Sequence, residues 1–307
     1  MDVRKNLDGK AVVTMIVLCL AWGAQQVAVK AVAEDIPPIL QISWRSGIAA
    51  FFVALVALAQ RNSVSFLKDT LKPGLLIGLL FALEFIFLSE GLKYTTASHV
   101  SVFLYTAPAF AALGLHWKLP TERLQGVQWF GMALAFLGVV AAFLGADPHT
   151  NTVSSPNILL GDFYSVLGGM AWGATTIVIR TSRLSNAPAT QTLLYQLLGA
   201  FVILLLGALF SGQTHFVLSP RALASLFFQS VLVSFVSYLI WFILLRRYLA
   251  SRLGVLSFLT PFFGIAFGVI LLGEPLEPSF VIGAILVFVG ILLVTAHGWL
   301  RQFYFKT

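Results

Sequence analysis

The feature that most constrains the fold of this chain is a series of long apolar runs separated by short segments rich in charge, proline and turn residues. Ten runs can be recognised, at 11–32, 37–59, 73–92, 96–115, 126–144, 158–180, 188–210, 222–245, 250–272 and 279–297. The hydrocarbon core of a bilayer takes about 20 apolar residues per helix, which is roughly the length of these runs. The sequence therefore predicts an all-α integral membrane protein with ten transmembrane helices.

The composition agrees with a membrane protein. Of the 307 residues, 59% are hydrophobic and 10% are charged, and the mean hydropathy is +0.92, whereas soluble domains are about 25% charged. The net charge of +7 would suggest a nucleic-acid partner in a soluble protein, but here the basic residues lie between the apolar runs, so we expect no nucleic-acid partner. Cys19 is the only cysteine, which excludes an intramolecular disulfide.

The connecting segments fall into two alternating sets that differ in basic residues. One set includes both termini and holds most of the Lys and Arg, whereas the other contains Lys30, Lys93 and Arg221. By the positive-inside rule we expect both termini in the cytoplasm and the protein in the bacterial inner membrane. A cleaved signal peptide over residues 1–33 is disfavoured, because its apolar run is too long and a copy of that run recurs in mid-chain.

That copy belongs to an internal repeat. The tetrapeptide Ala-Trp-Gly-Ala at 21–24 returns at 171–174, Pro108 corresponds to Pro261, and Glu122 corresponds to Glu274. The sequence thus predicts a first five-helix repeat over 1–145, a second over 158–297 and a cytoplasmic tail over 298–307. Because five crossings are an odd number, the second repeat should enter the membrane inverted, which is the plan of many carriers that work by alternating access. The alternative is a duplication that only enlarged a static bundle.

Several of these signatures resemble the drug/metabolite transporter superfamily, EamA type. The resemblance covers essentially the whole chain. It is carried by the repeated Trp-Gly pairs, Arg45 in the second run, the Ala-Ser…Pro pattern of the fourth and ninth runs, and the segments Glu122-Arg123-Leu124 and Gly273-Glu274-Pro275-Leu276. Tyr195 departs from the repeat, because it stands where a counterpart of Arg45 would be.

The resemblance implies export or exchange of amino acids, related metabolites or drugs. It also implies a central cavity lined by the first, third, fourth, sixth, eighth and ninth helices, and a structural role for Arg45.

Charged groups inside apolar runs are candidate functional residues, because they are costly in a membrane. Glu84 lies in the middle of the third run, where it could carry a proton, bind an amine, or act as a structural partner of Arg45 or His99. Arg45 either binds a substrate carboxylate or extends to the membrane surface. His99 could switch charge near neutral pH or simply be hydrogen-bonded.

Polar residues at helical spacing predict the rest of a substrate site. Ser230, Ser234, Ser237 and Trp241 follow one another at intervals of 4, 3 and 4, and a close packing of helices would explain the serines equally well. The candidate substrate-binding residues are Trp22, Gln25, Gln26, Glu84, His99, Ser101, Tyr105, Trp172, Thr175, Ser234, Ser237, Tyr238 and Trp241. Pro108, Pro261, Gly264 and Gly268 are candidate hinge or packing residues.

The sequence contains no phosphate-binding loop, metal-ligand spacing or cysteine pair, so we expect no cofactor, no metal site and no ATP-driven step. The interpretation that fits best is a secondary transporter, monomeric or homodimeric, that moves a small amphipathic metabolite, with protons as a candidate coupling ion. The alternatives are an intramembrane enzyme using Glu84 and His99, or a membrane receptor or scaffold.

Overall fold

The chain folds into helices throughout the described part. The computed structural model describes residues 8–59, 68–120, 123–144, 157–248, 253, 256–257 and 259–304. The α-helices of the first half are α1 (Gly9–Ala31), α2 (Pro38–Ala59), α3 (Lys68–Tyr94), α4 (Ala97–Leu104), α5 (Ala107–Lys118) and α6 (Gly126–Leu144). Those of the second half are α7 (Ile158–Thr181), α8 (Ala189–Phe210), α9 (Pro220–Phe227), α10 (Tyr238–Arg247), α12 (Leu259–Leu272) and α13 (Pro278–Tyr304). A 3₁₀ turn η2 (Arg183–Asn186) and a π-helical segment η3 (Phe228–Ser237) complete the described elements.

The all-helical membrane fold predicted from the apolar runs is confirmed. Six described helical segments are long and apolar enough to cross a membrane, at 9–31, 38–59, 70–94, 97–118, 189–210 and 220–244. Their outer faces expose large apolar side chains such as Phe210, Leu58 and Leu75, an arrangement that suits lipid rather than water. The count of ten crossings stays a prediction, because the other apolar helices are shorter or less hydrophobic.

The fourth apolar run forms two helices rather than the continuous one expected from its hydropathy. α4 ends at Leu104 and α5 begins at Ala107, with Pro108 in its first turn. Proline has no N–H to donate to the carbonyl four residues earlier, here that of Leu104, so an α-helix cannot continue unbroken through this point. Thr106 bridges the break, since its hydroxyl donates to the Phe103 carbonyl at 2.6 Å.

The eighth apolar run also departs from a uniform α-helix. Its middle part, η3, is wound as a π-helix between α9 and α10. The wider turn changes the direction of side chains relative to an α-helix, so spacing alone did not fix which residues share a face. Ser230, Ser234 and Ser237 are nevertheless all buried in the structure.

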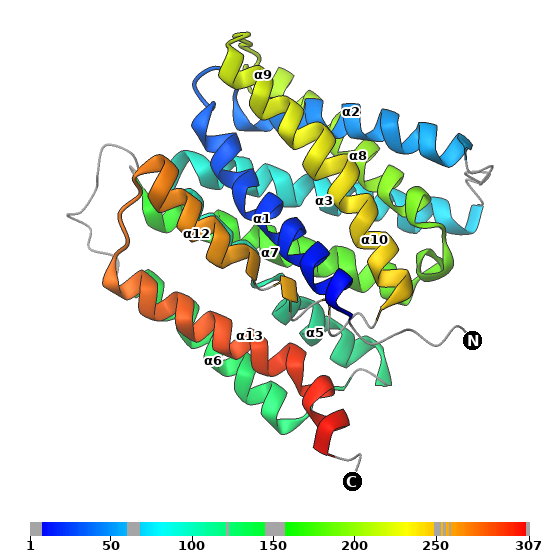
Figure 1. Ribbon diagram of the computed structural model, residues 1–307, viewed down its shortest axis with the longest axis vertical. Coiled ribbons are helices and arrows are strands. Elements are labelled where there is room, and N and C mark those ends of the chain that lie inside the picture. The colour runs from blue at the N-terminus through cyan, green and yellow to red at the C-terminus, as the bar shows by residue number, and fades with distance from the viewer. Residues whose placement is uncertain are drawn as a thin grey trace.

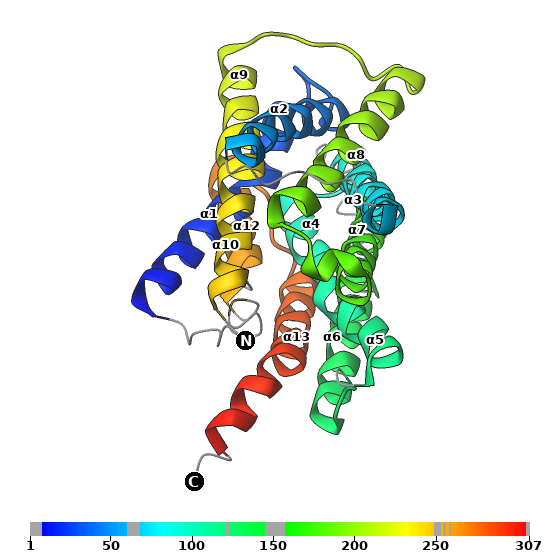
Figure 2. The same ribbon diagram turned by 90° about the vertical axis from the view of Figure 1, so that its right-hand side faces the viewer.

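Most of the extensive helix packing joins the first half of the chain to the second. α6 packs on α13, α3 on α7 and α8, α2 on α8 and η3, α1 on α12 and η3, and α4 and α5 on α7. α6 and α13 lie together at the lower edge of the molecule in both views (Figures 1 and 2). Some contacts recur between corresponding helices: α3 packs on α8, and η3 packs on α2.

Glycines permit the closest of these approaches. A Cβ on Gly23 of α1 would lie 2.7 Å from the Phe263 Cβ and 2.8 Å from the Gly264 nitrogen on α12. A Cβ on Gly173 of α7 would lie 2.8 Å from the Phe110 Cβ on α5. The glycine of each Trp-Gly pair therefore lets the opening helix of its half contact the proline-containing region of the other half.

Candidate functional site

A buried arginine of α2 lies against α3. Arg45 of α2 is 1% exposed, and its guanidinium carbon lies 4.5 Å from the centre of the Phe85 ring on α3. Its Nε and Nη1 atoms have no hydrogen-bond partner among the described residues. The interpretation that Arg45 extends to the membrane surface is therefore wrong, because the side chain is enclosed by protein.

A buried carboxylate lies near this arginine. Glu84 of α3 is 5% exposed, and its Oε2 atom has no hydrogen-bond partner among the described residues. The charges of Glu84 and Arg45 interact with each other and with the phenol of Tyr238. Within the described chain, the recorded ion pairs do not include one between Arg45 and Glu84. The charged centre, by which we mean Arg45, Glu84, Phe85, Tyr105 and Tyr238, thus holds a guanidinium and a carboxyl group that interact but form no ion pair.

Aromatic side chains form much of the charged centre, and Trp172 extends them. Tyr105, at the break between α4 and α5, interacts electrostatically with Glu84 and Tyr238. Its ring meets the Trp172 ring of α7 edge to face, with centroids 5.2 Å apart. Trp172 and Tyr238 both pack against the hydrophobic core that contains Phe85. The charged centre therefore combines a guanidinium, a carboxyl group and aromatic rings contributed by both halves.

The remaining predicted site residues on α1, η3 and α10 form a neighbouring group. Trp22 donates its Nε1–H to the Ser237 hydroxyl at 2.8 Å and meets the Trp241 ring edge to face at 5.5 Å. Gln25 and Gln26 lie one turn further along α1 and are each 4% exposed. This group joins the first helix of one half to the eighth run of the other.

Several buried polar atoms in this region lack a partner. Beyond Arg45 and Glu84, the described side chains with an unsatisfied buried oxygen include Gln26, Gln229, Ser234 and Thr260. An unsatisfied buried polar group costs about 1–3 kcal/mol, so such atoms normally mark the place of a water, an ion or a ligand. By contrast, Thr175 donates to the Ala171 carbonyl of its own helix at 3.0 Å.

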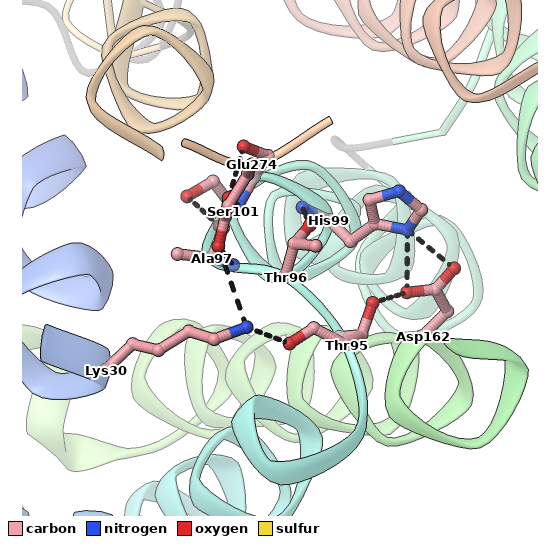
Figure 3. A network of polar contacts seen from close by, with 9 residues as sticks. Lys30, Thr95, Thr96, Ala97, His99, Ser101, Asp162 and Glu274 are labelled. Carbon is pink, nitrogen blue, oxygen red and sulfur yellow. Dashed lines mark hydrogen bonds and ion pairs between the residues drawn. The ribbon is translucent and has the colours of Figure 1, made fainter. Parts of the chain in front are cut away.

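His99 lies in a different polar group, shown in Figure 3. Its Nδ1 is 2.9 Å from both oxygens of Asp162 on α7, and its ring stacks on Phe280 of α13 at 3.8 Å. Asp162 also accepts a hydrogen bond from the Thr95 hydroxyl at 2.7 Å. The ring of His99 is therefore already bonded to Asp162. Asp162 was not predicted from the sequence, although it is an ionisable residue inside the sixth apolar run.

The same group contains a capped helix terminus. Glu274, in the link between α12 and α13, accepts hydrogen bonds from the backbone N–H of Ala97 at 2.7 Å and of Ser98 at 2.9 Å (Figure 3). It also accepts from the Ser98 hydroxyl at 2.7 Å, and Lys30 Nζ lies 3.6 Å away. A carboxylate at a helix N-terminus is stabilised by the free N–H groups and the helix dipole. We call Lys30, Thr95, Ser98, His99, Asp162 and Glu274 the end network.

The predicted packing residues lie beside these groups. Gly264 and Gly268 of α12 face α4, where a Cβ on Gly264 would collide with Ser101 and one on Gly268 would collide with Ser98 and Glu274. Ser101 itself donates to the Ala97 carbonyl at 2.8 Å. Pro261 is buried in the first turn of α12. The structure thus separates the predicted residues into the charged centre with its aromatic surround, the Trp22 group, and the α4–α12 seam next to the end network.

Known proteins resemble this chain in sequence and in fold. The model of the EamA-like transporter family matches residues 9–144 and 159–296, one segment in each half. A protein of Bacillus subtilis named as the uncharacterized transporter YoaV is 25% identical over 93% of this chain and 97% of its own length. A probable amino-acid metabolite efflux pump of Salmonella typhimurium is 26% identical, over 90% of this chain and 91% of its own length.

A similar protein and a solved structure extend the comparison. A probable amino-acid metabolite efflux pump of Escherichia coli is 25% identical over 91% of this chain and 92% of its own. A crystal structure with 19% identity covers 97% of this chain and 98% of its own chain with a TM-score of 0.67, a likeness of fold. Since the family matches most of both halves, the chain belongs to the EamA-like transporter family of the drug/metabolite transporter superfamily and is a multi-pass membrane transporter.

Proposed function

We propose that this transporter exports a small amphipathic metabolite of the amino-acid class across the bacterial inner membrane. The observation that carries the proposal is the charged centre, because two unjoined charges buried among aromatic rings suit a solute with both polar and apolar parts. The printed names of the Salmonella and Escherichia relatives, which are amino-acid metabolite efflux pumps, favour the same substrate class and direction.

The proposed mechanism is alternating access between two inverted repeats, 1–145 and 158–297. The end network supports it, since Lys30, Thr95 and Ser98 of the first half bond to Asp162 and Glu274 of the second. These contacts lie where α1 ends, on the side that the positive-inside rule places outside the cell. In this mechanism the end network holds the outer side closed and must separate before a solute can leave.

Substrate binding is assigned to the charged centre and the Trp22 group. Glu84, Tyr105, Trp172 and Tyr238 would contact the solute directly, together with Gln26 and Ser234, whose buried oxygens lack protein partners. His99 and Ser101 would act at the closed end instead, because both are already bonded within that region.

Transport itself is tested in proteoliposomes that contain the purified full chain. Vesicles are loaded with a panel of amino acids and related metabolites, and the solutes are analysed by mass spectrometry after efflux. A solute that leaves unchanged supports a carrier, whereas a chemically converted solute supports the alternative of an intramembrane enzyme. Absence of movement for every solute would overturn the proposed function.

Glu84 is the proposed site of coupling to protons. The test compares solute movement with and without a pH gradient for the wild type, Glu84→Gln and the control Glu90→Gln, which lies on the same helix but pairs with Lys93 near the surface. We expect Glu84→Gln to lose the response to the gradient and Glu90→Gln to keep it. If Glu84→Gln responds to the gradient as the wild type does, Glu84 is not the coupling site.

The topology is tested separately. We propose cytoplasmic N- and C-termini, so a tag on either end should be labelled only after the cells are permeabilised. Labelling of a tagged end in intact cells would contradict this orientation and the inverted arrangement built on it.

A further inference from the structure

We infer that Arg45 and Glu84 together form a recognition site for a zwitterion, in which Arg45 binds the carboxylate and Glu84 binds the ammonium group of a free amino acid. The inference rests on the proposed function and makes it more specific. It assigns Arg45 a ligand-binding role, in contrast to the structural role implied by the family resemblance.

The first argument is the state of the two side chains. Other buried charged groups of the described chain have partners: Asp162 binds His99 and Thr95, and Glu274 caps α4. Arg45 instead has two unpartnered nitrogens and Glu84 an unpartnered oxygen, although each side chain is at least nine-tenths buried. A buried charge without a partner strongly destabilises the folded protein. If Arg45 and Glu84 had only a structural role, we would therefore expect them to form a direct ion pair.

The second argument is charge balance. A guanidinium and a carboxylate leave the site with no net charge, and a zwitterion adds none when it binds. An anion would satisfy Arg45 but leave Glu84 facing it, whereas a cation would leave Arg45 without a partner, and either would place an excess charge in a low-dielectric interior. A free amino acid brings an acceptor and a donor that share one carbon atom, so it can bridge two groups that do not reach each other.

The third argument is the surface around the charges. Phe85 holds the guanidinium over its ring face at 4.5 Å, which orients Arg45 without using any of its hydrogen-bond donors. Tyr105 and Tyr238 lie within electrostatic reach of Glu84, and Trp172 contacts Tyr105. These rings offer apolar contact for the side chain of an amino acid while the two charged groups hold its backbone end.

The experiment separates the two halves of the zwitterion. The full chain in lipid nanodiscs is titrated calorimetrically with L-leucine, L-phenylalanine and L-threonine, and with the methyl ester and the N-acetyl derivative of each. The ester lacks the carboxylate and the N-acetyl form lacks the ammonium group. We expect at least one free amino acid to bind, and its two derivatives to bind roughly 30-fold more weakly or worse, because each leaves one buried charge unpaired.

Two variants then assign the groups. Arg45→Gln should lose the preference for the free acid over the ester but keep the preference over the N-acetyl form, and Glu84→Gln should do the reverse. Glu90→Gln is the control and should match the wild type. A merely structural role for Arg45 would weaken all three ligands alike. If Arg45→Gln does not fold, Arg45→Lys, which keeps the charge, should retain the preference for the acid over the ester at lower affinity.

Several results would overturn the inference. They are equal binding of free acid and derivatives by the wild type, no binding of any free amino acid tested, or a uniform loss of affinity in the variants. Such a result leaves the proposed function standing if another solute is still carried unchanged in proteoliposomes, and the two proposals therefore fail separately.

Discussion

Replacement of Glu274 by glutamine should open the outer side of the transporter. In the structure, Glu274 Oε1 accepts from the Ala97 N–H, while Oε2 accepts from the Ser98 N–H and hydroxyl. A glutamine can place its single side-chain oxygen at the Oε2 position. The two hydrogen bonds from Ser98 are then kept, but their acceptor is an uncharged amide oxygen. Its amide nitrogen then faces the Ala97 N–H, so that donor loses its acceptor, and Lys30 loses its negative partner 3.6 Å away.

The magnitude follows from these contacts. A hydrogen bond to a charged group contributes about 1.5–3 kcal/mol. The charge at the N-terminus of α4 adds about 0.3–1 kcal/mol, and somewhat more when partly buried. The closed form should therefore be destabilised by about 2–4 kcal/mol relative to an open form in which residue 274 is hydrated. Because about 1.4 kcal/mol corresponds to a factor of ten, the equilibrium should shift by roughly 30- to 700-fold toward the open form.

The assay uses accessibility of a single cysteine. Cys19 is replaced by serine and Ser101, a buried residue one turn below Ser98 on α4, by cysteine. A membrane-impermeant maleimide applied to right-side-out vesicles should label Ser101→Cys slowly in the parent and much faster after Glu274→Gln. The exposed Glu34, which follows α1 on the same side, provides the control Glu34→Gln, with labelling as slow as in the parent. Equal labelling rates with and without Glu274→Gln would refute the role of the end network.

Three further predictions concern stability. Gly23→Ala should lower stability by about 1–3 kcal/mol in thermal unfolding, since its Cβ would meet the Gly264 nitrogen at 2.8 Å, whereas Gly126→Ala, with nothing within 4 Å, should be neutral. Asp162→Asn should cost about 1–3 kcal/mol because one of the oxygens bonded to His99 or Thr95 is lost, and unchanged unfolding would contradict the bonding described. Hydrogen bonds from the Ala11 N–H and the Tyr248 hydroxyl hold the pKa of Asp8 below its ordinary value. The ionised Asp8 carboxylate therefore stabilises the folded protein at pH values above the unfolded-state pKa, and this contribution is lost as the pH falls through the lowered pKa. Acid melting profiles should consequently lose part of their pH dependence in Asp8→Asn, and an unaltered profile would count against this linkage.

The membrane fold could be predicted because a helix that crosses the bilayer needs about 20 consecutive apolar residues, and such runs are visible in the sequence. Most boundaries of the described helices fall within a few residues of the runs, although α13 continues to Tyr304, past the predicted end at 297. The break at Pro108 was foreseeable as a lost hydrogen bond, but hydropathy alone joined α4 and α5. The π-helical winding of η3 was not foreseeable, since it depends on how neighbouring helices pack around residues 228–237.

Individual residues of the candidate site could be predicted from the sequence, but not which of them lie together. Glu84 and His99 were noticeable as ionisable groups in apolar runs, and Asp162 satisfies the same rule but was passed over. The sequence gives no means of pairing them, because His99 meets Asp162 and Lys30 meets Glu274 only through the packing of the two halves. Glu122 and the Ala250-Ser251 pair lie outside the described residues.

The packing of each half against the other has a consequence for biosynthesis. Because α1, α2, α3 and α6 each find their main partners on helices made later, the first 145 residues enter the membrane before the surfaces they will pack on exist. During that interval Arg45 and Glu84 lack the neighbours that the second half supplies, such as Tyr238. Synthesised alone, the amino-terminal half should be a target for membrane proteases, and coexpression of the missing half as a separate polypeptide should rescue it.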